Sequence, residues 1–332
     1  MIKRALKAAS GMLYMHSRSG KQALANNALI LMLHRVVEED NYAALPHRNE
    51  LCVGQASFDR LLVWLKRRFD ITELQTLLTT PPTSSRPRVA LTFDDGWYDN
   101  ATLALPVLQR HQVPASIFLS TDFIDSEQGF WWESIGETLW GSFGEQATQQ
   151  LLTSLSEIGK PVAADLPNLP QNSERSQAIM RYLASLKDQP ATVLQALADS
   201  CPVGKQPQAM SWQQVSRLEQ SGLIRFGAHG ASHALLDRLP SAEIHAELQR
   251  SLTVVAQRCE QPLPVYCYPN GNHSEAVHQH LQSLNVPYAL STRPGLYRDN
   301  SPALALPRIG VSQVTASNPN LLAWRIRQGA NA

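Results

Sequence analysis

Two adjacent aspartates, Asp94 and Asp95, follow an apolar run in the segment RVALTFDDGWYDN. Two close carboxylates repel each other, and the pKa of one of them rises unless a cation balances the charge. Further along, HGASH places His229 and His233 at the H-x-x-x-H spacing, which predicts two imidazoles on one side of a single helical turn. Two histidines and one carboxylate can hold a metal ion and leave positions open for water and substrate. One aspartate would then be a ligand and the other a base, although a helix cap and a solvated aspartate also explain the pair.

The elements that must position these residues are apolar, β-prone runs that alternate with helical patterns. The strand-like runs cover 28–33, 89–93, 115–119, 224–228, 265–268 and 288–291, and the main helical patterns cover 58–69, 101–111, 211–221, 241–258 and 274–284. This alternation predicts a parallel sheet with crossover helices, either doubly wound or closed as a barrel. In α/β barrels the reactive residues gather at the C-terminal ends of the strands. His34, the aspartate pair and His229 each follow such a run.

The span from about residue 131 to residue 210 breaks this alternation. It opens with an aromatic cluster that includes Trp131 and Trp132 and continues with helix-forming segments. Because strands and helices alternate again after it, we interpret this span as a helical insertion within a single barrel of residues 28–332.

Residues 1–27 form a basic amphipathic segment. Ile2, Leu6, Ala9 and Leu13 recur at helical spacing, and no acidic residue precedes Glu38. A helix of this kind lies on an anionic membrane surface or packs against the core of its own protein. The spacing leaves both alternatives open.

Composition limits the class of protein. The 332 residues carry a formal net charge of +1, which gives no general case for a nucleic-acid partner. The four cysteines form no CxxC pair, so neither a disulfide framework nor a cysteine zinc site is indicated. No apolar run approaches the roughly 18 residues that span a bilayer, and the start lacks the apolar region of a secretion signal. We therefore expect a cytoplasmic protein, with peripheral contact at the inner membrane through residues 1–27.

The two motifs together resemble those of the polysaccharide deacetylases, carbohydrate esterase family 4. TFDDG and HGASH carry the resemblance, and three further segments extend it: VPASIFLSTDFID at 113–125, CYPNG at 267–271 and LPRIGV at 306–311. The resemblance covers roughly residues 28–311. It implies an α/β fold, a distorted (β/α) barrel of about seven strands, and a metal-dependent enzyme that removes acetyl groups from N-acetylated sugars.

The resemblance also implies roles for individual residues. In the family, the first aspartate of the motif is the general base and the second is a metal ligand, which assigns these roles to Asp94 and Asp95. His229 and His233 complete the ligand set. The metal is usually zinc, with cobalt, nickel or manganese as alternatives, and it lowers the pKa of water and polarises the acetamide carbonyl. A backbone N–H of the third motif, here that of Asn270, is expected to bind the oxyanion.

Two departures from the family pattern concern the base and the acid. The third motif commonly begins with an arginine that orients the base, but Cys267 occupies this place. Arg308 is the candidate substitute, although an arginine there also suits a structural ion pair. The late histidine that serves many relatives as general acid has no match. Residues 31–36, LMLHRV, resemble a segment of poly-N-acetylglucosamine deacetylases, so we expect His34 to be the acid, with His273 as the alternative.

Aromatic side chains complete the predicted site. Trp97 and Tyr268, with Trp131 and Trp132, are candidates for a groove in which sugar rings stack, and core packing is the alternative. The predicted substrate is an N-acetylhexosamine of a bacterial cell-envelope glycan or of a lipid-linked or lipopolysaccharide precursor. Two other functions stay open on the sequence: hydrolysis of non-sugar C–N bonds such as cyclic amides or ureides, and carbohydrate binding without catalysis.

Overall fold

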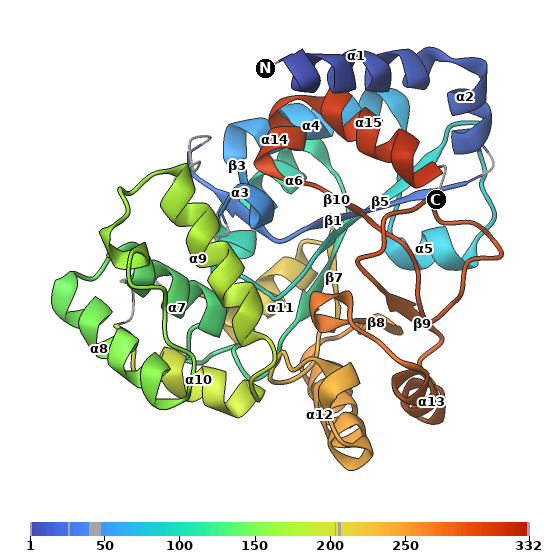
Figure 1. Ribbon diagram of the computed structural model, residues 1–332. Coiled ribbons are helices and arrows are strands. Elements are labelled where there is room, and N and C mark those ends of the chain that lie inside the picture. The colour runs from blue at the N-terminus through green and yellow to red at the C-terminus, as the bar shows by residue number, and fades with distance from the viewer. Residues whose placement is uncertain (1, 26, 40–47, 203, 205–206, 331–332) are drawn as a thin grey trace.

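A curved parallel sheet forms the centre of the computed structural model, which describes residues 2–25, 27–39, 48–202, 204 and 207–330 (Figure 1). Its seven-strand path runs in the order β10 (Ile309–Gly310), β1 (Leu29–Leu33), β5 (Arg88–Phe93), β6 (Ala115–Leu119), β7 (Ile224–Ala228), β8 (Val265–Cys267) and β9 (Tyr288–Leu290), and β4 (Asp70–Ile71) also pairs with β5. Every pair in this sheet is parallel. The predicted α/β class is confirmed.

The chain segment that leads into β10 brings the two edges of the sheet together. The N–H of Leu306 donates to the carbonyl oxygen of Ala289 in β9, and the N–H of Ser291 donates back to the carbonyl oxygen of Leu306. A few residues later, Ile309 pairs with Leu31 of β1. One segment therefore contacts both edges, and the prediction of a distorted barrel of about seven strands is confirmed.

Crossover helices cover the outside of this sheet. They are α4 (Gln55–Arg68), α5 (Leu74–Thr79), the π-helical turn η1 (Asn100–Ala104) with α6 (Leu105–His111), α11 (Trp212–Gln220), α12 (Ser241–Arg258) and α13 (Glu275–Ser283). The pattern of α4 shows why they pack there: Phe58, Leu61, Leu62 and Leu65 recur at helical spacing and are all fully buried. Shorter elements connect the rest: β2 (Arg35–Val37), which pairs with β3 (Cys52–Gly54), α3 (Arg48–Leu51), η3 (Leu236–Arg238) and η4 (Pro269–Gly271).

A group of helices stands beside the sheet, between β6 and α11 (green to yellow-green in Figure 1). It contains α7 (Trp131–Trp140), α8 (Glu145–Glu157), η2 (Leu166–Asn168), α9 (Ser173–Leu186) and α10 (Ala191–Asp199). The helix α7 contacts α8, α9 and α10, so it lies at the centre of this group.

The N-terminal helices α1 (Ile2–His16) and α2 (Arg18–Ala25) lie at one edge of the molecule. The helix α1 runs along α15 (Pro319–Ala330), which follows α14 (Gln313–Ser317) near the C-terminus (Figure 1). Residues 1 and 26 of the predicted N-terminal segment lie outside the described residues. Within the described ranges, no helix combines the length and the apolar character that crossing a membrane requires.

Candidate active site

The predicted site residues meet at one edge of the sheet. His34 follows β1, Asp94 and Asp95 follow β5, His229 follows β7, and Cys267 ends β8. The C-terminal ends of parallel strands lie at the same edge, where the loops of α/β barrels carry their reactive groups. Sequence positions that are more than two hundred residues apart therefore contribute to one site.

A sharp turn brings both aspartates into the same pocket. Asp95 adopts a left-handed backbone conformation with φ of 76°, and Gly96 follows with φ of 83°. A Cβ on Gly96 would lie 2.9 Å from the side chain of Leu119, so only glycine fits this turn without displacement. The turn breaks the alternation of a strand, in which neighbouring side chains would point to opposite faces. Both carboxylates are consequently buried in one site, each 2% exposed.

The two histidines of HGASH converge on Asp95. Its Oδ1 lies 3.2 Å from Nε2 of His229 and 3.3 Å from Nε2 of His233. The three side chains form a group whose ligand atoms are close enough to hold one metal ion. Burial by itself raises the pKa of Asp95, but hydrogen bonds and charge from the imidazoles in their protonated form hold this pKa well below its usual range.

The prediction that these histidines share a helical turn is wrong. Residues 229–233 form a loop after β7, and His233 has a left-handed φ of 57°. Glu247 of α12 holds this loop in place: its Oε1 accepts from the N–H groups of Ala231 (2.9 Å) and Ser232 (2.6 Å) and from the hydroxyl of Ser232 (2.9 Å). A buried carboxylate thus replaces the backbone acceptors that a helix would have supplied.

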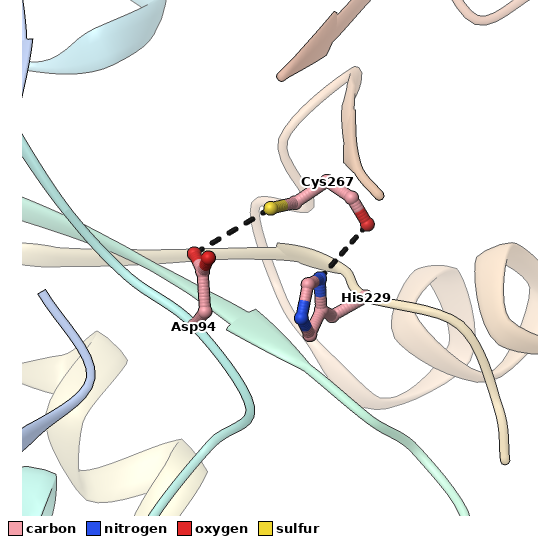
Figure 2. Close-up of side chains that lie close together, drawn as sticks. All are labelled: Asp94, His229 and Cys267. Atoms are coloured by element: carbon pink, nitrogen blue, oxygen red, sulfur yellow. Dashed lines mark hydrogen bonds between the residues drawn. The ribbon is translucent and has the colours of Figure 1, made fainter. Parts of the chain in front are cut away.

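The hydrogen bonding of His229 decides whether a cation fits between these groups. Its Nδ1 lies 2.9 Å from the carbonyl oxygen of Cys267 (Figure 2). A carbonyl only accepts, so Nδ1 carries the hydrogen and Nε2 of the neutral ring is an acceptor. That Nε2 faces Asp95 Oδ1, a buried acceptor without a hydrogen-bond partner among the described residues. Acceptors that face one another in a buried site are stabilised by a positive charge between them, and a divalent metal fits this donor set.

Arg308 forms a bidentate pair with the other aspartate. Its two terminal nitrogens lie 2.7 Å from Oδ1 and Oδ2 of Asp94, and its Nε–H donates to the carbonyl oxygen of Ser291 at 2.9 Å. The guanidinium is fully buried. Burial alone would raise the pKa of Asp94, but the Arg308 charge and its hydrogen bonds hold this pKa below its usual value. The two predicted roles of Arg308, as the partner that orients the base and as a member of a structural ion pair, are therefore the same, because its buried ion pair is made with Asp94.

Cys267 also contacts Asp94. Its Sγ is 3.5 Å from Asp94 Oδ1, and the side chain is fully buried (Figure 2). The place where the resemblance predicts an arginine on β8 thus holds a small thiol. The arginine that contacts Asp94 comes instead from the segment before β10.

Trp97 and Tyr268 do not line a sugar-binding groove, contrary to the prediction. Both side chains are fully buried. The indole N–H of Trp97 donates to Asp95 Oδ2 at 2.8 Å, and the guanidinium of Arg35 lies 4.3 Å from the centre of the indole ring. The hydroxyl of Tyr268 donates to the carbonyl oxygen of Leu304 at 2.8 Å. Trp97 therefore orients a carboxylate, and Tyr268 ties the third motif to the segment that closes the barrel.

A cavity of about 1200 Å³ opens above the two aspartates. Its walls come from the barrel loops and from the helical group beside the sheet; they include Trp131, Trp132, Leu183, Lys187, Leu194, Arg238 and Asn270. The ammonium group of Lys187 donates to the side-chain oxygen of Asn270 at 2.5 Å. This contact joins the helical group directly to the third motif.

His34 and His273 differ in their access to this cavity. His34 lines it, with a 16% exposed side chain and its Nε2 3.9 Å from Asp94 Oδ2. The Nδ1 of His273 instead lies 3.1 Å from Nε2 of His278, and its ring lies beside that of the buried Tyr268. Of the two histidines considered as proton donors, His34 faces the reacting groups.

Glu247 and Lys187 are site residues that sequence reasoning missed. Glu247 lies within the helical pattern of α12, where a carboxylate is ordinarily solvated, and Lys187 follows α9 in the group of helices beside the sheet. No spacing relates either residue to the two motifs. Both residues can be assigned to the site only from the contacts that they make in the folded chain.

Comparison with known proteins identifies the family. A family profile described as polysaccharide deacetylase matches residues 82–289, which is more than half of the chain. The chain belongs to the polysaccharide deacetylase family. The matched range includes both aspartates and both histidines of the motifs, whereas His34 and Arg308 lie outside it. A search of curated protein sequences found no significant match.

Solved structures show the same fold at low sequence identity. The deacetylase PplD of Streptococcus pyogenes, solved with acetate, has a TM-score of 0.56 and 18% identity over 89% of this chain and 96% of that one. IcaB from Ammonifex degensii has a TM-score of 0.56 and 14% identity over 90% and 97% of the two chains. The polysaccharide deacetylase BC0361 from Bacillus cereus has a TM-score of 0.56 and 15% identity over 89% and 69%. These structures support the fold, and the family assignment identifies a carbohydrate deacetylase.

Proposed function

We propose that this protein is a metal-dependent N-deacetylase that removes the acetyl group from an N-acetylated sugar. The observation that carries the proposal is the buried convergence of Asp95 Oδ1 with Nε2 of His229 and Nε2 of His233. Asp95 Oδ1 and Nε2 of the neutral His229 ring are acceptors that face each other in a buried site, an arrangement that suits a cation.

Asp95, His229 and His233 would hold the metal. Nitrogen and oxygen donors suit zinc, with cobalt, nickel and manganese as alternatives. When bound, a metal of this kind polarises the acetamide carbonyl and lowers the pKa of water. The hydrogen bond from Trp97 to Asp95 and that from His229 to the Cys267 carbonyl orient two of the ligands, as supporting contacts do in metal sites.

Asp94 is the proposed general base. Arg308 keeps it ionised and fixes both of its oxygens, so the carboxylate is held ready to accept the proton of the attacking water. The water oxygen then bonds to the acyl carbon, and the C–N bond breaks to give acetate and an amine. His34 is the proposed donor of the proton that the leaving nitrogen takes up. The backbone N–H of Asn270, on the cavity wall, is the proposed donor to the oxyanion.

The cavity supports a substrate larger than one sugar ring. Its volume of about 1200 Å³ exceeds that of pockets for typical small ligands. Trp131 and Trp132 contribute aromatic surface, which complements the apolar faces of pyranoses. We propose an N-acetylhexosamine within an envelope glycan or a lipid-linked or lipopolysaccharide-type precursor.

The test is acetate release from a panel of N-acetylhexosamine oligosaccharides and glycolipids, with and without a chelator. We expect Asp94→Asn to abolish acetate release while the metal content stays nearly unchanged, and Asp95→Asn to lower both. Asp122→Asn is a matched control, because Asp122 is another carboxylate of the cavity and pairs with Arg250 at 2.9 Å. Full turnover by Asp94→Asn would refute the role of the base, and turnover that survives complete metal removal would refute metal dependence. Ring opening of cyclic amides without acetate release would show that the protein hydrolyses non-sugar C–N bonds, and it would refute the proposed reaction.

A further inference from the structure

The helix α1 presents a stripe of apolar side chains to solvent, while Tyr14 and Met15 pack against the core. Its buried contact is made at Gly11, where a Cβ would lie 2.1 Å from the carbonyl oxygen of Asn320 in α15. Ile2, Leu6 and Leu13 lie on the opposite side of the helix, as the helical repeat requires. They are 79%, 64% and 67% exposed. The helix therefore packs on its own protein through the face that carries Gly11, while the apolar stripe itself stays outside the core.

The stripe gathers most of the exposed apolar side chains of the molecule. Among the described residues, the exposed large hydrophobic side chains are those of Ile2, Leu6, Met12, Leu13 and Val314, and all but the last belong to α1. Single exposed apolar residues are ordinary on protein surfaces, but a contiguous apolar stripe indicates an interaction surface.

Basic residues lie on α1 and on the helices next to it. The helices α1, α2, α14 and α15 contain no aspartate or glutamate. Their exposed basic residues are Lys3, Arg4, Lys7, Arg18, Lys21, Arg325 and Arg327. The ammonium group of Lys7 lies 4.3 Å from the centre of the Trp324 ring, and Arg327 donates to the hydroxyl of Ser10, so both contacts fix α1 on α15.

We propose that α1 docks this protein on an anionic membrane surface. A helix with an outward apolar stripe and basic flanks lies in the headgroup region, where the stripe enters the acyl boundary and the cations meet anionic lipids. A second copy of the chain suits this surface less well. Two copies in contact through this face would bring together basic helices that contain no carboxylate to compensate the repulsion.

This docking is separate from the proposed chemistry. None of the residues that line the described cavity belongs to α1 or α2. Loss of docking therefore leaves turnover of a soluble substrate unchanged, and loss of activity leaves docking unchanged. The two proposals can fail independently.

The test is cosedimentation of the full-length protein with vesicles of phosphatidylcholine alone or of phosphatidylcholine mixed with phosphatidylglycerol. We expect binding to the anionic vesicles that weakens as salt is added, because surface charges are screened. The triple variant Ile2→Asn, Leu6→Asn, Leu13→Asn should bind at least about tenfold more weakly, since it removes the side chains that enter the lipid. Val314→Asn, an exposed apolar position outside α1, should bind as the original protein does.

Two further measurements complete the test. Thermal unfolding of the triple variant should match that of the original protein, because the replaced side chains are exposed and make few contacts. Equal vesicle binding by both proteins, or no binding by the original protein, would overturn the proposal. Sedimentation velocity gives the other possible outcome: a dimer that dissociates in the triple variant would assign the stripe to a second copy and also overturn it.

Discussion

Arg308→Met is the substitution that most directly tests how the base is controlled. Arg308 supplies the bidentate partner of Asp94, and both side chains are at least 98% buried. Methionine is unbranched and apolar, and it is shorter than arginine and uncharged, so the variant leaves a buried carboxylate without its cation. Arg308→Lys keeps the charge and loses the paired geometry.

The size of the effect follows from this contact. An arginine beside a carboxylate lowers its pKa by about 1–3 units, so removing Arg308 should raise the pKa of Asp94 by about that amount. The acidic limb of the pH profile of kcat/KM then moves to higher pH, because the base is lost as pH falls through the raised pKa. Loss of one partner from a buried ion pair also costs about 3–5 kcal/mol of folding free energy.

The stability of the variant should depend on pH in the opposite sense to that of the original protein. In the original protein the pKa of folded Asp94 lies below 3.8, so the stability that this group contributes is lost only as pH falls through that lowered value. In Arg308→Met the folded pKa lies above the unfolded one, so the variant loses stability as pH rises through it. The difference in Tm between the two proteins should therefore shrink in acid.

The assay is the pH dependence of kcat/KM for acetate release, measured at low temperature, together with thermal unfolding at each pH. Arg298→Met is a matched control, since the side chain of Arg298 donates to the Ala330 carbonyl, away from the cavity. We expect Arg308→Lys to give an acidic limb between those of the original protein and Arg308→Met. If Arg308→Met folds and retains the original limb, Arg308 does not govern the ionisation of Asp94 and the reasoning is refuted.

Substitutions at three further positions test the groups around the proposed metal ligands. Trp97→Phe removes the N–H that donates to Asp95, and we expect about 10–100-fold weaker metal binding in competition with a chelator; unchanged affinity would contradict the orienting role. Glu247→Ala leaves two N–H groups of the histidine loop without their acceptor, at about 1–3 kcal/mol each, so Tm and metal affinity should fall. Glu247→Gln keeps an acceptor and should recover most of the Tm and most of the metal affinity. If Glu247→Gln loses as much of either as Glu247→Ala does, the negative charge of Glu247 matters instead. Cys267→Ser should retain metal and activity, whereas lost metal would favour the second possible ligand group, which Cys267 forms with Asp94 and His229.

Much of the fold follows from local sequence. Runs such as 115–119 and 224–228 coincide with observed strands, and 241–258 coincides with α12, because apolar periodicity and short β-prone runs are local properties. The closure of the barrel could not be predicted from local sequence patterns. It depends on the segment around Leu306 and Ile309, which pairs with strands that are close and very distant in sequence.

Local patterns were misleading where the backbone leaves regular geometry. The H-x-x-x-H spacing predicts a helical turn, but the observed loop is held by Glu247, which comes from the next helix. The aromatic character of Trp97 fits a sugar groove and a buried hydrogen-bond donor equally well. Spacing and side-chain type say nothing about which distant group will lie beside a residue.

The sequence by itself determined which side chains carry the chemistry: two adjacent aspartates, a spaced pair of histidines, and an outlying arginine and histidine as candidates to serve them. Only the tertiary structure decided their partners. It paired Arg308 with Asp94 across 214 positions, turned Trp97 inward, and left the apolar stripe of α1 outside the core. The physical reason is that residue types fix what a group can do, whereas its pKa, orientation and exposure depend on neighbours that only the folded chain brings together.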